Sequence, residues 1–308
     1  MVSVELRPAQ PDAHFPEVEA GAHIDLHLGD GLIRSYSLTN PGERQAYVIA
    51  VLRDPHSRGG SAYVHEQLRV GQIIDISAPR NHFKLNELAA HSVLLAGGIG
   101  ITPVYAMLQR LMHLNRSVEL IYFARSREEA AYVERLNALE LARKDGDPLK
   151  LIKMYFNDEV KSRPDLFHVL SGFAKEAHFY CCGPVSMLNA FETACETLGF
   201  PHVHVERFAA SGKLVDAGET DAYRVELKKS CKNIFVPQGV SLLDALLKNG
   251  LKPDFSCREG VCGACETKIL AGKVIHRDHI LTKQEQAENK SMMICVSSGC
   301  GDGLILDL

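Results

Sequence analysis

Three cysteines lie close together in the C-terminal third of the chain, and a fourth follows at a distance. Cys257, Cys262 and Cys265 have the spacing Cys-x4-Cys-x2-Cys, and Cys295 comes 30 residues after the last of them. A plant-type [2Fe-2S] cluster uses this spacing, because four thiolates from a loop and one distant position ligate its two irons. Glycines between these cysteines allow the backbone to pass close to a cluster. The spacing therefore predicts a [2Fe-2S] cluster held by these four thiolates.

Two other uses of clustered cysteines fit the sequence less well. A four-cysteine zinc site commonly has two Cys-x2-Cys pairs, whereas this loop has one. An odd count of nine cysteines and a start without a secretory signal disfavour a disulfide framework. Cys300 is the one rival of Cys295 for the fourth ligand position. We interpret Cys300 as structural, together with three further cysteines: Cys181, Cys195 and Cys231.

Composition bounds the class of protein. A chain of 308 residues has room for two or three domains, and its 46% hydrophobic and 23% charged residues are typical of a globular protein. The sequence has no apolar run of the roughly 18 residues that a membrane span needs. The formal charge of −4 comes without a basic block. We therefore expect a cytoplasmic protein, monomeric, that binds neither nucleic acid nor membrane.

Residues 1–88 show the pattern of short strands and turns that is typical of a small antiparallel β-barrel. Alternating residues 22–28 and apolar residues 46–52 are two of its expected strands. On a third strand, Arg34, Tyr36 and Leu38 share one face by period two, and Ser37 adds a hydroxyl. A later run, Arg58-Gly59-Gly60-Ser61, offers a second guanidinium beside permissive glycines, as a phosphate site would.

The pattern changes from residue 89 to residue 208, where strands alternate with helices. Apolar strand 92–96 leads into Gly97-Gly98-Ile99-Gly100-Ile101-Thr102-Pro103 and a helix over 104–113. Further strands are expected over 118–124, 149–155 and 178–182, and helices over 128–143 and 185–198. This alternation predicts a doubly wound parallel sheet, which binds ligands at the carboxyl ends of its strands.

A segment rich in Ala, Gly, Ser and Asp follows and predicts a linker over 209–222. Residues 223–308 then contain two expected strands, a helix capped by Ser241 and the cysteine loop. The fold class predicted for the whole chain is therefore multidomain: an antiparallel β-barrel, an α/β doubly wound domain and a C-terminal α+β domain of the plant-type ferredoxin kind.

These motifs in this order resemble the class IA reductase components of Rieske oxygenases, a family that includes phthalate dioxygenase reductase and vanillate demethylase reductases. The resemblance covers nearly the whole chain. It implies an FMN-binding barrel, an NAD(P)-binding domain and a C-terminal [2Fe-2S] domain. It also implies that electrons pass from NADH through FMN and the cluster to a Rieske-type oxygenase, which would be the partner of this chain.

The family also implies roles for the residues of the barrel. By resemblance, Arg34 faces the flavin phosphate, Tyr36 packs on the isoalloxazine and Ser37 lies near flavin N5, where it would be catalytic. The loop Arg58, Gly59, Gly60 and Ser61 would complete the FMN phosphate site.

The nucleotide domain carries the remaining implied residues. The glycine loop resembles the pyridine-nucleotide loop of the family, with binding residues Gly97, Gly98, Gly100 and Thr102. The turn Cys182-Gly183-Pro184 would bring Cys182 beside the nicotinamide, where it would shape hydride transfer. A buried cysteine is also commonly part of a core, so both interpretations of Cys182 remain open.

The choice of pyridine nucleotide is poorly specified by the residues. An NAD site usually has an acidic residue at the end of its second strand, whereas this chain has Arg125-Ser126-Arg127 there. Arg125 would suit the 2′-phosphate of NADPH, while the family resemblance favours NADH, which we expect to be the donor.

Other functions remain as alternatives. The chain would also suit a reductase for a haem or di-iron monooxygenase, and a non-enzymatic iron-sulfur carrier is a less favoured reading. One departure from the family concerns the start: the family usually has an extra strand before the segment that matches Val4 to Arg7. An open barrel edge there would weaken flavin retention, so we expect partial loss of FMN on dilution.

Overall fold

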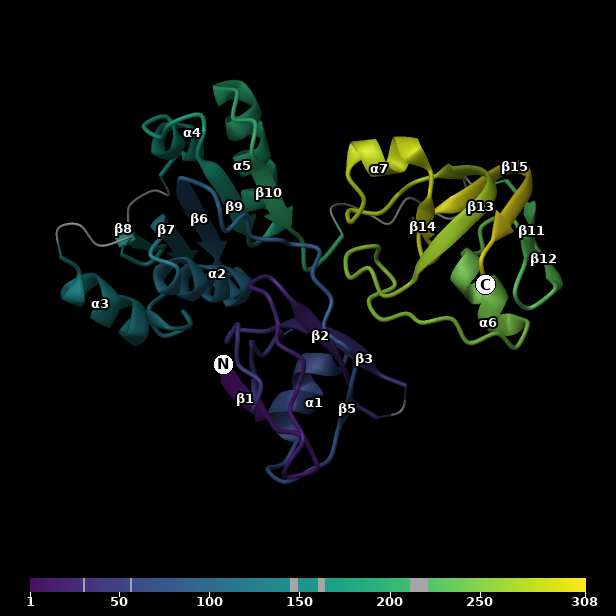
Figure 1. Cartoon of the computed structure of the whole chain (residues 1–308), viewed down its shortest axis with the longest axis horizontal. Coiled ribbons are helices and arrows are strands. Elements are labelled where there is room, and N and C mark those ends of the chain that lie inside the picture. Colours follow the sequence, from purple (N-terminus) through teal and green to yellow (C-terminus); the bar gives the residue numbers. More distant parts are fainter. Residues whose placement is uncertain (30, 56, 145–148, 160–163, 211–220) are drawn as a thin grey trace. The chain divides into compact units, whose positions relative to one another are not determined.

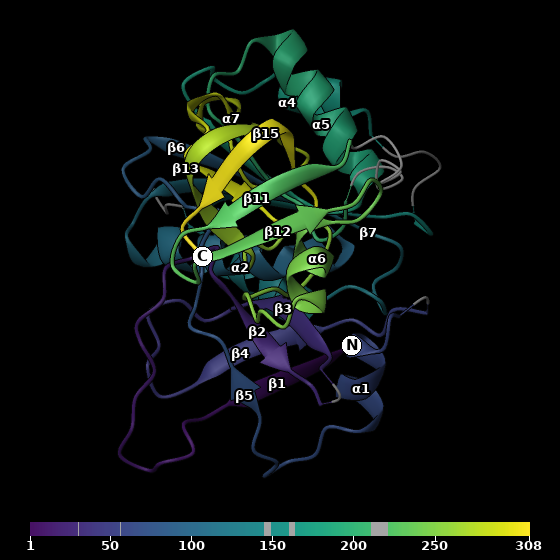
Figure 2. The same cartoon turned by 90° about the vertical axis from the view of Figure 1, so that its right-hand side faces the viewer.

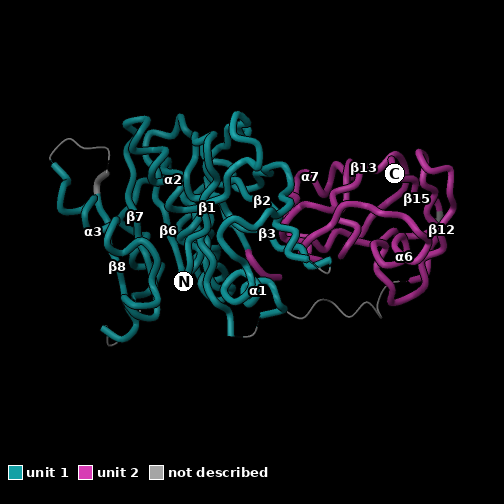
Figure 3. The backbone as a smooth tube through the Cα atoms, turned by 90° about the horizontal axis from the view of Figure 1, so that it is seen from below, with its two compact units in different colours: residues 1–207 teal, residues 208–308 magenta. Residues whose placement is uncertain are grey.

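A computed structural model describes residues 1–29, 31–55, 57–144, 149–159, 164–210 and 221–308. The chain divides into two compact units, Met1–Arg207 and Phe208–Leu308 (Figure 3). The first unit contains the barrel and the nucleotide-binding sheet, and the second contains the cysteine loop. No described helix is both long and apolar enough to cross a lipid bilayer.

The barrel part of the first unit is antiparallel. Its strands are β1 (Val2–Leu6), β2 (His23–His27), β3 (Ile33–Ser37), β4 (Tyr47–Val51) and β5 (Asp75–Ile76), and its helix is α1 (Gly60–Glu66). β1 pairs with β4 over its full length, and β2 lies between β3 and β5. A bridge between Leu38 and Ile49 connects the two sheets. Both side chains are buried in a core with Ile24, Leu26 and Tyr47.

The nucleotide part is a five-stranded parallel sheet in the order β10-β9-β6-β7-β8. Its strands are β6 (His91–Gly97), β7 (Ser117–Ala124), β8 (Leu149–Phe156), β9 (His178–Cys182) and β10 (Val203–Glu206). Its helices are η1 (Gly98–Gly100), α2 (Ile101–His113), α3 (Val133–Ala142), α4 (Leu166–Leu170) and α5 (Val185–Leu198).

Helices cover both faces of this sheet (Figure 1). One core packs α2 and α3 against residues such as Leu94, Leu120 and Tyr180. The other packs α4 and α5 against Val93, Leu95 and their neighbours. Because alternate residues of β6 enter opposite cores, the strand reads as a continuous apolar run, as expected for a buried parallel strand.

The second unit is a five-stranded sheet in the order β12-β11-β15-β13-β14. Its strands are β11 (Tyr223–Leu227), β12 (Lys232–Val236), β13 (Glu266–Ile275), β14 (Ser291–Met293) and β15 (Ser298–Leu306), and its helices are α6 (Leu242–Lys248) and α7 (Lys283–Glu288). β11 and β12 form an antiparallel pair (Figure 2). Ser241 caps α6 by accepting a hydrogen bond from the Asp244 amide, as its residue type predicts.

The predicted fold class is confirmed in its three parts, while some local expectations differ. The helix expected over 128–143 begins only at Val133, because Tyr132 has φ +60° and stacks on Tyr105 at 4.3 Å. The boundaries at 88, 208 and 222 stay predictions. Residues 211–220 of the predicted linker lie outside the described part of the chain.

Candidate functional site

The cysteine loop lies between α6 and β13 and turns sharply. Arg258, Gly260 and Gly263 have φ values of +60°, +68° and +71°. At Gly260 a Cβ atom would come within 2.7 Å of Val296 Cγ2 and 3.1 Å of Asp278 Cα. This position therefore requires glycine for both its backbone angle and its space.

Strand pairing brings the distant fourth cysteine to this loop. Glu266, the residue after Cys265, pairs with Met293, and Cys295 follows two residues later. Cys262 and Cys265 are each 4% exposed and Cys295 is 8% exposed. Cys300 instead lies on β15 opposite Lys273 and is exposed. The structure thus brings the four predicted ligands together and leaves the rival outside the group.

The four sulfurs are close enough to act on one another. The Cys257 amide lies 3.4 Å from Cys262 Sγ, and the Glu259 amide donates to Cys257 Sγ at 3.3 Å. Hydrogen bonds from the Cys262 and Cys295 thiols lower the pKa of Cys257 well below its usual range. A hydrogen bond with Cys295 likewise lowers the pKa of Cys265. All nine cysteines are free.

This donor set fits a cluster. Four sulfurs in one place, with backbone amides that donate to them, are what a [2Fe-2S] cluster requires. Among the described residues, no three His, Cys, Asp or Glu side chains lie close enough together to hold a single metal ion. A [2Fe-2S] cluster does not need such a group, because each iron takes two thiolates.

Strand β3 presents the residues that were predicted to bind flavin. Ser35 Oγ donates to Asp25 Oδ1 at 2.6 Å, and Arg80 Nη2 lies 2.6 Å from Asp25 Oδ2. These bonds fix one face of β3, so that Arg34 and Tyr36 project from the other. Burial raises the pKa of Tyr36 to about 12, while Arg34 acts in the opposite direction. The phenol therefore remains neutral at ordinary pH.

The second predicted element, residues 58–61, lies against this strand. Arg34 Nη2 donates to the Arg58 carbonyl at 2.6 Å. A Cβ on Gly60 would lie 2.4 Å from Arg34 Cγ, so only glycine allows the guanidinium stem to pass. Ser61 Oγ accepts a hydrogen bond from the Asp54 amide at 3.2 Å. The guanidinium of Arg34 thus reaches the backbone of the loop that carries Arg58, the second predicted phosphate residue.

The glycines of the nucleotide loop differ in what they do. A Cβ on Gly97 would meet Pro184 Cδ and Met187 Sδ at 2.6 Å, and one on Gly100 would meet the Cys182 carbonyl oxygen at 2.2 Å. Both glycines therefore allow this loop to pack on the turn that follows β9. Gly98 has φ +55° and nothing within 4 Å of its Cβ position. Of the three, Gly98 is the one whose backbone faces open space.

Two hydroxyl groups hold this loop in place. Thr102 is buried, and its Oγ1 donates to the Ile99 carbonyl at 3.0 Å. Tyr122 Oη donates to the Gly98 carbonyl at 3.1 Å and accepts from the Ala131 amide at 3.1 Å. The predicted binding residue Thr102 thus acts on the loop itself, and Tyr122 is a supporting residue that the sequence did not single out.

Cys182 ends β9 and lies between two strands, in register with Ala96 and Glu206. Burial raises its pKa well above the usual range, with Glu206 and Cys181 acting in the same direction. Burial also raises the pKa of Glu206 to about 8. The Oε2 atom of Glu206 has no hydrogen-bond partner in the part of the chain that the structure describes. Both groups are therefore neutral near pH 7.

The arginines at the carboxyl end of β7 are paired with acids. Arg125 lies 3.9 Å from Glu129, and Arg127 lies 2.5 Å from Glu159. The Asp158 amide donates to the Arg125 carbonyl at 3.3 Å, which brings a further carboxylate to this edge. The pKa of Arg127 is raised, chiefly by its hydrogen bond to Glu159.

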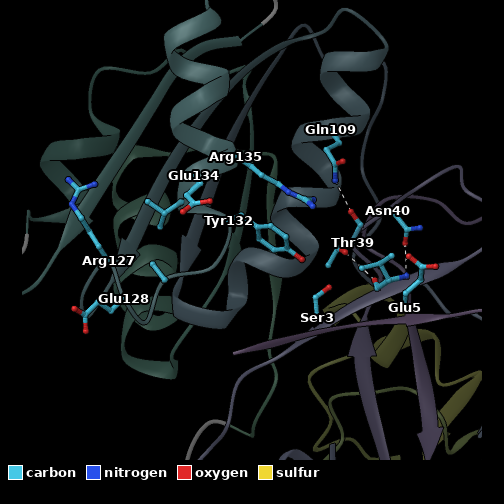
Figure 4. A pocket seen from close by; sticks show the side chains of 13 residues that line it. Ser3, Glu5, Thr39, Asn40, Gln109, Arg127, Glu128, Tyr132, Glu134 and Arg135 are labelled. Carbon is cyan, nitrogen blue, oxygen red and sulfur yellow. Dashed lines mark hydrogen bonds between the residues drawn. The ribbon is translucent and has the colours of Figure 1, made fainter. Parts of the chain in front are cut away.

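A cavity of about 870 Å³ lies elsewhere in the first unit, between β1 and the segment that leads into α3 (Figure 4). Tyr132 and Arg135 project toward its barrel side, where Gln109 Nε2 donates to the Thr39 carbonyl at 2.6 Å. None of the predicted FMN residues is among the described residues that line this cavity. It is therefore distinct from the site formed by β3 and residues 58–61.

Comparison with known proteins matches two family models to this chain. Residues 94–193 match an oxidoreductase NAD-binding domain, and residues 216–298 match a 2Fe-2S iron-sulfur cluster binding domain. The phenoxybenzoate dioxygenase subunit beta of Ectopseudomonas oleovorans is 46% identical over 99% of this chain and 92% of its own length.

Two solved structures are similar over 99% of this chain. Phthalate dioxygenase reductase, described as a modular structure for electron transfer from pyridine nucleotides to [2Fe-2S], is 32% identical with a TM-score of 0.66 over 92% of its chain. An intact type IV self-sufficient cytochrome P450 monooxygenase is 36% identical with a TM-score of 0.88, and the match spans 39% of that longer chain.

A parallel nucleotide-binding sheet, an antiparallel barrel and a four-cysteine loop in one chain define an iron-sulfur oxidoreductase that uses a pyridine nucleotide. More narrowly, the chain belongs to the family of reductase components of oxygenase systems. The family assignment made from the sequence motifs is confirmed.

Proposed function

We propose that this chain takes a hydride from NADH onto FMN and delivers single electrons through its [2Fe-2S] cluster to a Rieske-type oxygenase. The observation that carries this proposal is the convergence of four cysteines in a chain that also has an NAD-binding domain. When bound, FMN converts the two electrons of a hydride into single electrons, which the cluster carries one at a time.

The FMN would be held by the face of β3 and by residues 58–61. We assign the phosphate to Arg34 and Arg58, because the Arg34 guanidinium lies against the backbone of the loop that carries Arg58 and guanidinium groups pair well with phosphate. The neutral Tyr36 ring would pack on the isoalloxazine. Ser37 shares the other face of β3 with Ser35, and because it is the last residue of the strand, it would reach flavin N5 around the strand end. Gly59, Gly60 and Ser61 would shape the phosphate loop.

The nicotinamide would lie at the carboxyl ends of β6 and β9. Gly98 would allow the pyrophosphate to approach, while Gly97, Gly100, Gly183 and Pro184 hold the two loops together. Cys182 and Glu206 would give the nicotinamide an uncharged surface that excludes water. A protonated Glu206 also has a hydrogen to donate to the carboxamide.

NADH is favoured over NADPH by charge. A 2′-phosphate beside Arg125 would also meet Glu129, Asp158 and Glu159, so the carboxylates offset the arginines at this edge. The arginines predicted to accept NADPH are therefore poorly suited to an added phosphate. Substrate discrimination is measured as the ratio of kcat/KM for the two nucleotides, and a ratio above one for NADPH would overturn this proposal.

In the second unit, Cys257, Cys262, Cys265 and Cys295 would ligate the cluster. We further propose that the chain acts in the cytoplasm as a monomer, since a reducing compartment suits its nine free cysteines.

The acceptor is tested by reconstitution. The dioxygenase relative favours a Rieske oxygenase, whereas similarity to a cytochrome P450 monooxygenase favours a haem acceptor as the second candidate. We expect NADH consumption coupled to product when the reductase is combined with the oxygenase encoded beside its gene. Coupled turnover with an isolated P450 haem domain, and none with that oxygenase, would support the second candidate. No flavin bleaching by NADH would instead indicate a carrier without reductase activity.

A further inference from the structure

Two residues shortly after β13, Arg277 and Asp278, contact the segment that follows the fourth cysteine. Arg277 Nη1 donates to Ser298 Oγ at 2.7 Å, and the Arg277 amide donates to Ser297 Oγ at 3.2 Å. Ser297 Oγ in turn donates to Asp278 Oδ1 at 3.3 Å. The backbone just beyond Cys295 is therefore tied to this segment by side-chain hydrogen bonds.

The same segment packs on the loop that contains the other three cysteines. Asp278 Cα lies 3.1 Å from the position of a Cβ on Gly260, and the His279 amide donates to the Gly260 carbonyl at 2.9 Å. Asp278 Oδ2 accepts hydrogen bonds from the amides of Ile280 and Leu281, at 3.2 and 2.8 Å. Asp278 thus lies where the two ligand-bearing segments meet.

The surroundings of Asp278 are dry. Its side chain is 0% exposed, and the neighbouring His276 side chain is 7% exposed with its Nδ1 3.7 Å from Asp278 Oδ1. Neither ring nitrogen of His276 has a hydrogen-bond partner among the residues described. A carboxylate in such a place is poorly screened, so its charge opposes the addition of an electron nearby more than an exposed carboxylate would. Arg277 offsets part of this charge from the Ser298 side.

We propose that Asp278 is a positioning residue of the iron-sulfur site. It joins the three-cysteine loop to the Cys295 segment, and its buried charge lowers the reduction potential of the cluster. This inference rests on the proposed four-cysteine ligand set.

The test compares Asp278→Asn with the matched control Asp254→Asn. Asp254 is exposed and lies three residues before Cys257, so the control removes one carboxylate near the loop without removing a buried charge. The midpoint potential is measured on the holoprotein by redox titration with visible circular dichroism and electron paramagnetic resonance. At a fixed solution potential we expect Asp278→Asn to raise the ratio of reduced to oxidised cluster by about tenfold. This corresponds to a rise of about 59 mV in the midpoint potential of the cluster. The control should keep the wild-type potential.

A second variant, Ser297→Ala, removes the two hydrogen bonds that Ser297 Oγ makes with Arg277 and Asp278, and it keeps the carboxylate. We expect its cluster to be lost to a chelator several-fold faster than that of the wild type. If Asp278→Asn does not fold, the rate of cluster loss from Ser297→Ala tests the proposal, and a rate equal to that of the wild type overturns it. Wild-type potential and cluster lifetime in a folded Asp278→Asn would also overturn it. A wild-type protein without a [2Fe-2S] spectrum would instead refute the underlying ligand set.

Discussion

Replacing Glu206 by glutamine is expected to change how stability depends on pH. Glu206 lies at the end of β10, in register with Cys182, and its Oε2 is buried without a hydrogen-bond partner in the described chain. Burial raises its pKa from 4.5 to about 8. Glutamine has nearly the same shape and no proton to lose, so it removes the ionisation and keeps most of the packing.

The sign follows from comparing the folded and unfolded states. Below pH 4.5 the carboxyl is protonated in both states and has no effect. As pH rises from 4.5 to about 8, the unfolded chain ionises while Glu206 in the folded protein stays protonated, so the wild type loses stability. A shift of this size corresponds to about 5 kcal/mol. Because the residue is only partly buried, solvent reduces the loss to roughly 2–4 kcal/mol.

The assay is calorimetric unfolding of the holoprotein between pH 5 and pH 8. The difference in Tm between Glu206→Gln and the wild type should increase by roughly 5–10 °C from pH 5 to pH 8. This is the shift that a change of a few kcal/mol produces in a unit of about 200 residues. Glu176→Gln is the control, because Glu176 is exposed and precedes β9 in the same unit. A difference in Tm between Glu206→Gln and the wild type that stays constant with pH would refute the reasoning.

Three further predictions test the proposed sites. Cys262→Ser should abolish acceptor reduction while stopped-flow absorbance still shows NADH reducing the flavin; loss of both would mean that the loop has a structural role. Gly60→Ala should displace Arg34, whose Cγ lies 2.4 Å from the position of the new Cβ. Equilibrium dialysis should then show FMN binding weakened by about 10- to 100-fold. The control Gly172→Ala has no atom within 4 Å of its new Cβ and should bind FMN as the wild type does; equal FMN affinities of the two variants would contradict the phosphate site. Asp158→Asn should raise kcat/KM for NADPH relative to NADH by roughly two- to fivefold, and an unchanged ratio would show that this carboxylate plays no part in nucleotide choice.

The features that the sequence revealed are those with a strong local pattern. The cysteine spacing identified the four residues that strand pairing brings together, because an iron-sulfur loop depends on short-range spacing and on one strand that returns. Alternation of strands and helices revealed the parallel sheet. On β3, the period of two placed Arg34 and Tyr36 on one face, and the bond from Ser35 to Asp25 anchors the other.

Features that depend on tertiary contacts were not visible in the sequence. Gly97 and Gly98 are adjacent in one motif, yet one packs on Pro184 and the other faces open space. Glu206 lies in an ordinary strand, and only the neighbouring strand shows that its carboxyl group is buried beside a cysteine. Residues 128–132 are rich in helix formers, but Ala131 and Tyr132 are used to hold Tyr122 and Tyr105. Contacts with distant residues there override local propensity.

The central claim is that electrons pass from NADH through flavin to the four-cysteine cluster. The most direct test is anaerobic titration of the purified holoprotein with NADH, followed by visible absorption and electron paramagnetic resonance. Two electrons on the flavin and one on the cluster require about 1.5 NADH per chain. The account predicts flavin bleaching and a reduced-cluster signal that are complete near that ratio. A cluster that stays oxidised while the flavin is fully reduced, or that NADH reduces in flavin-free protein, would contradict it.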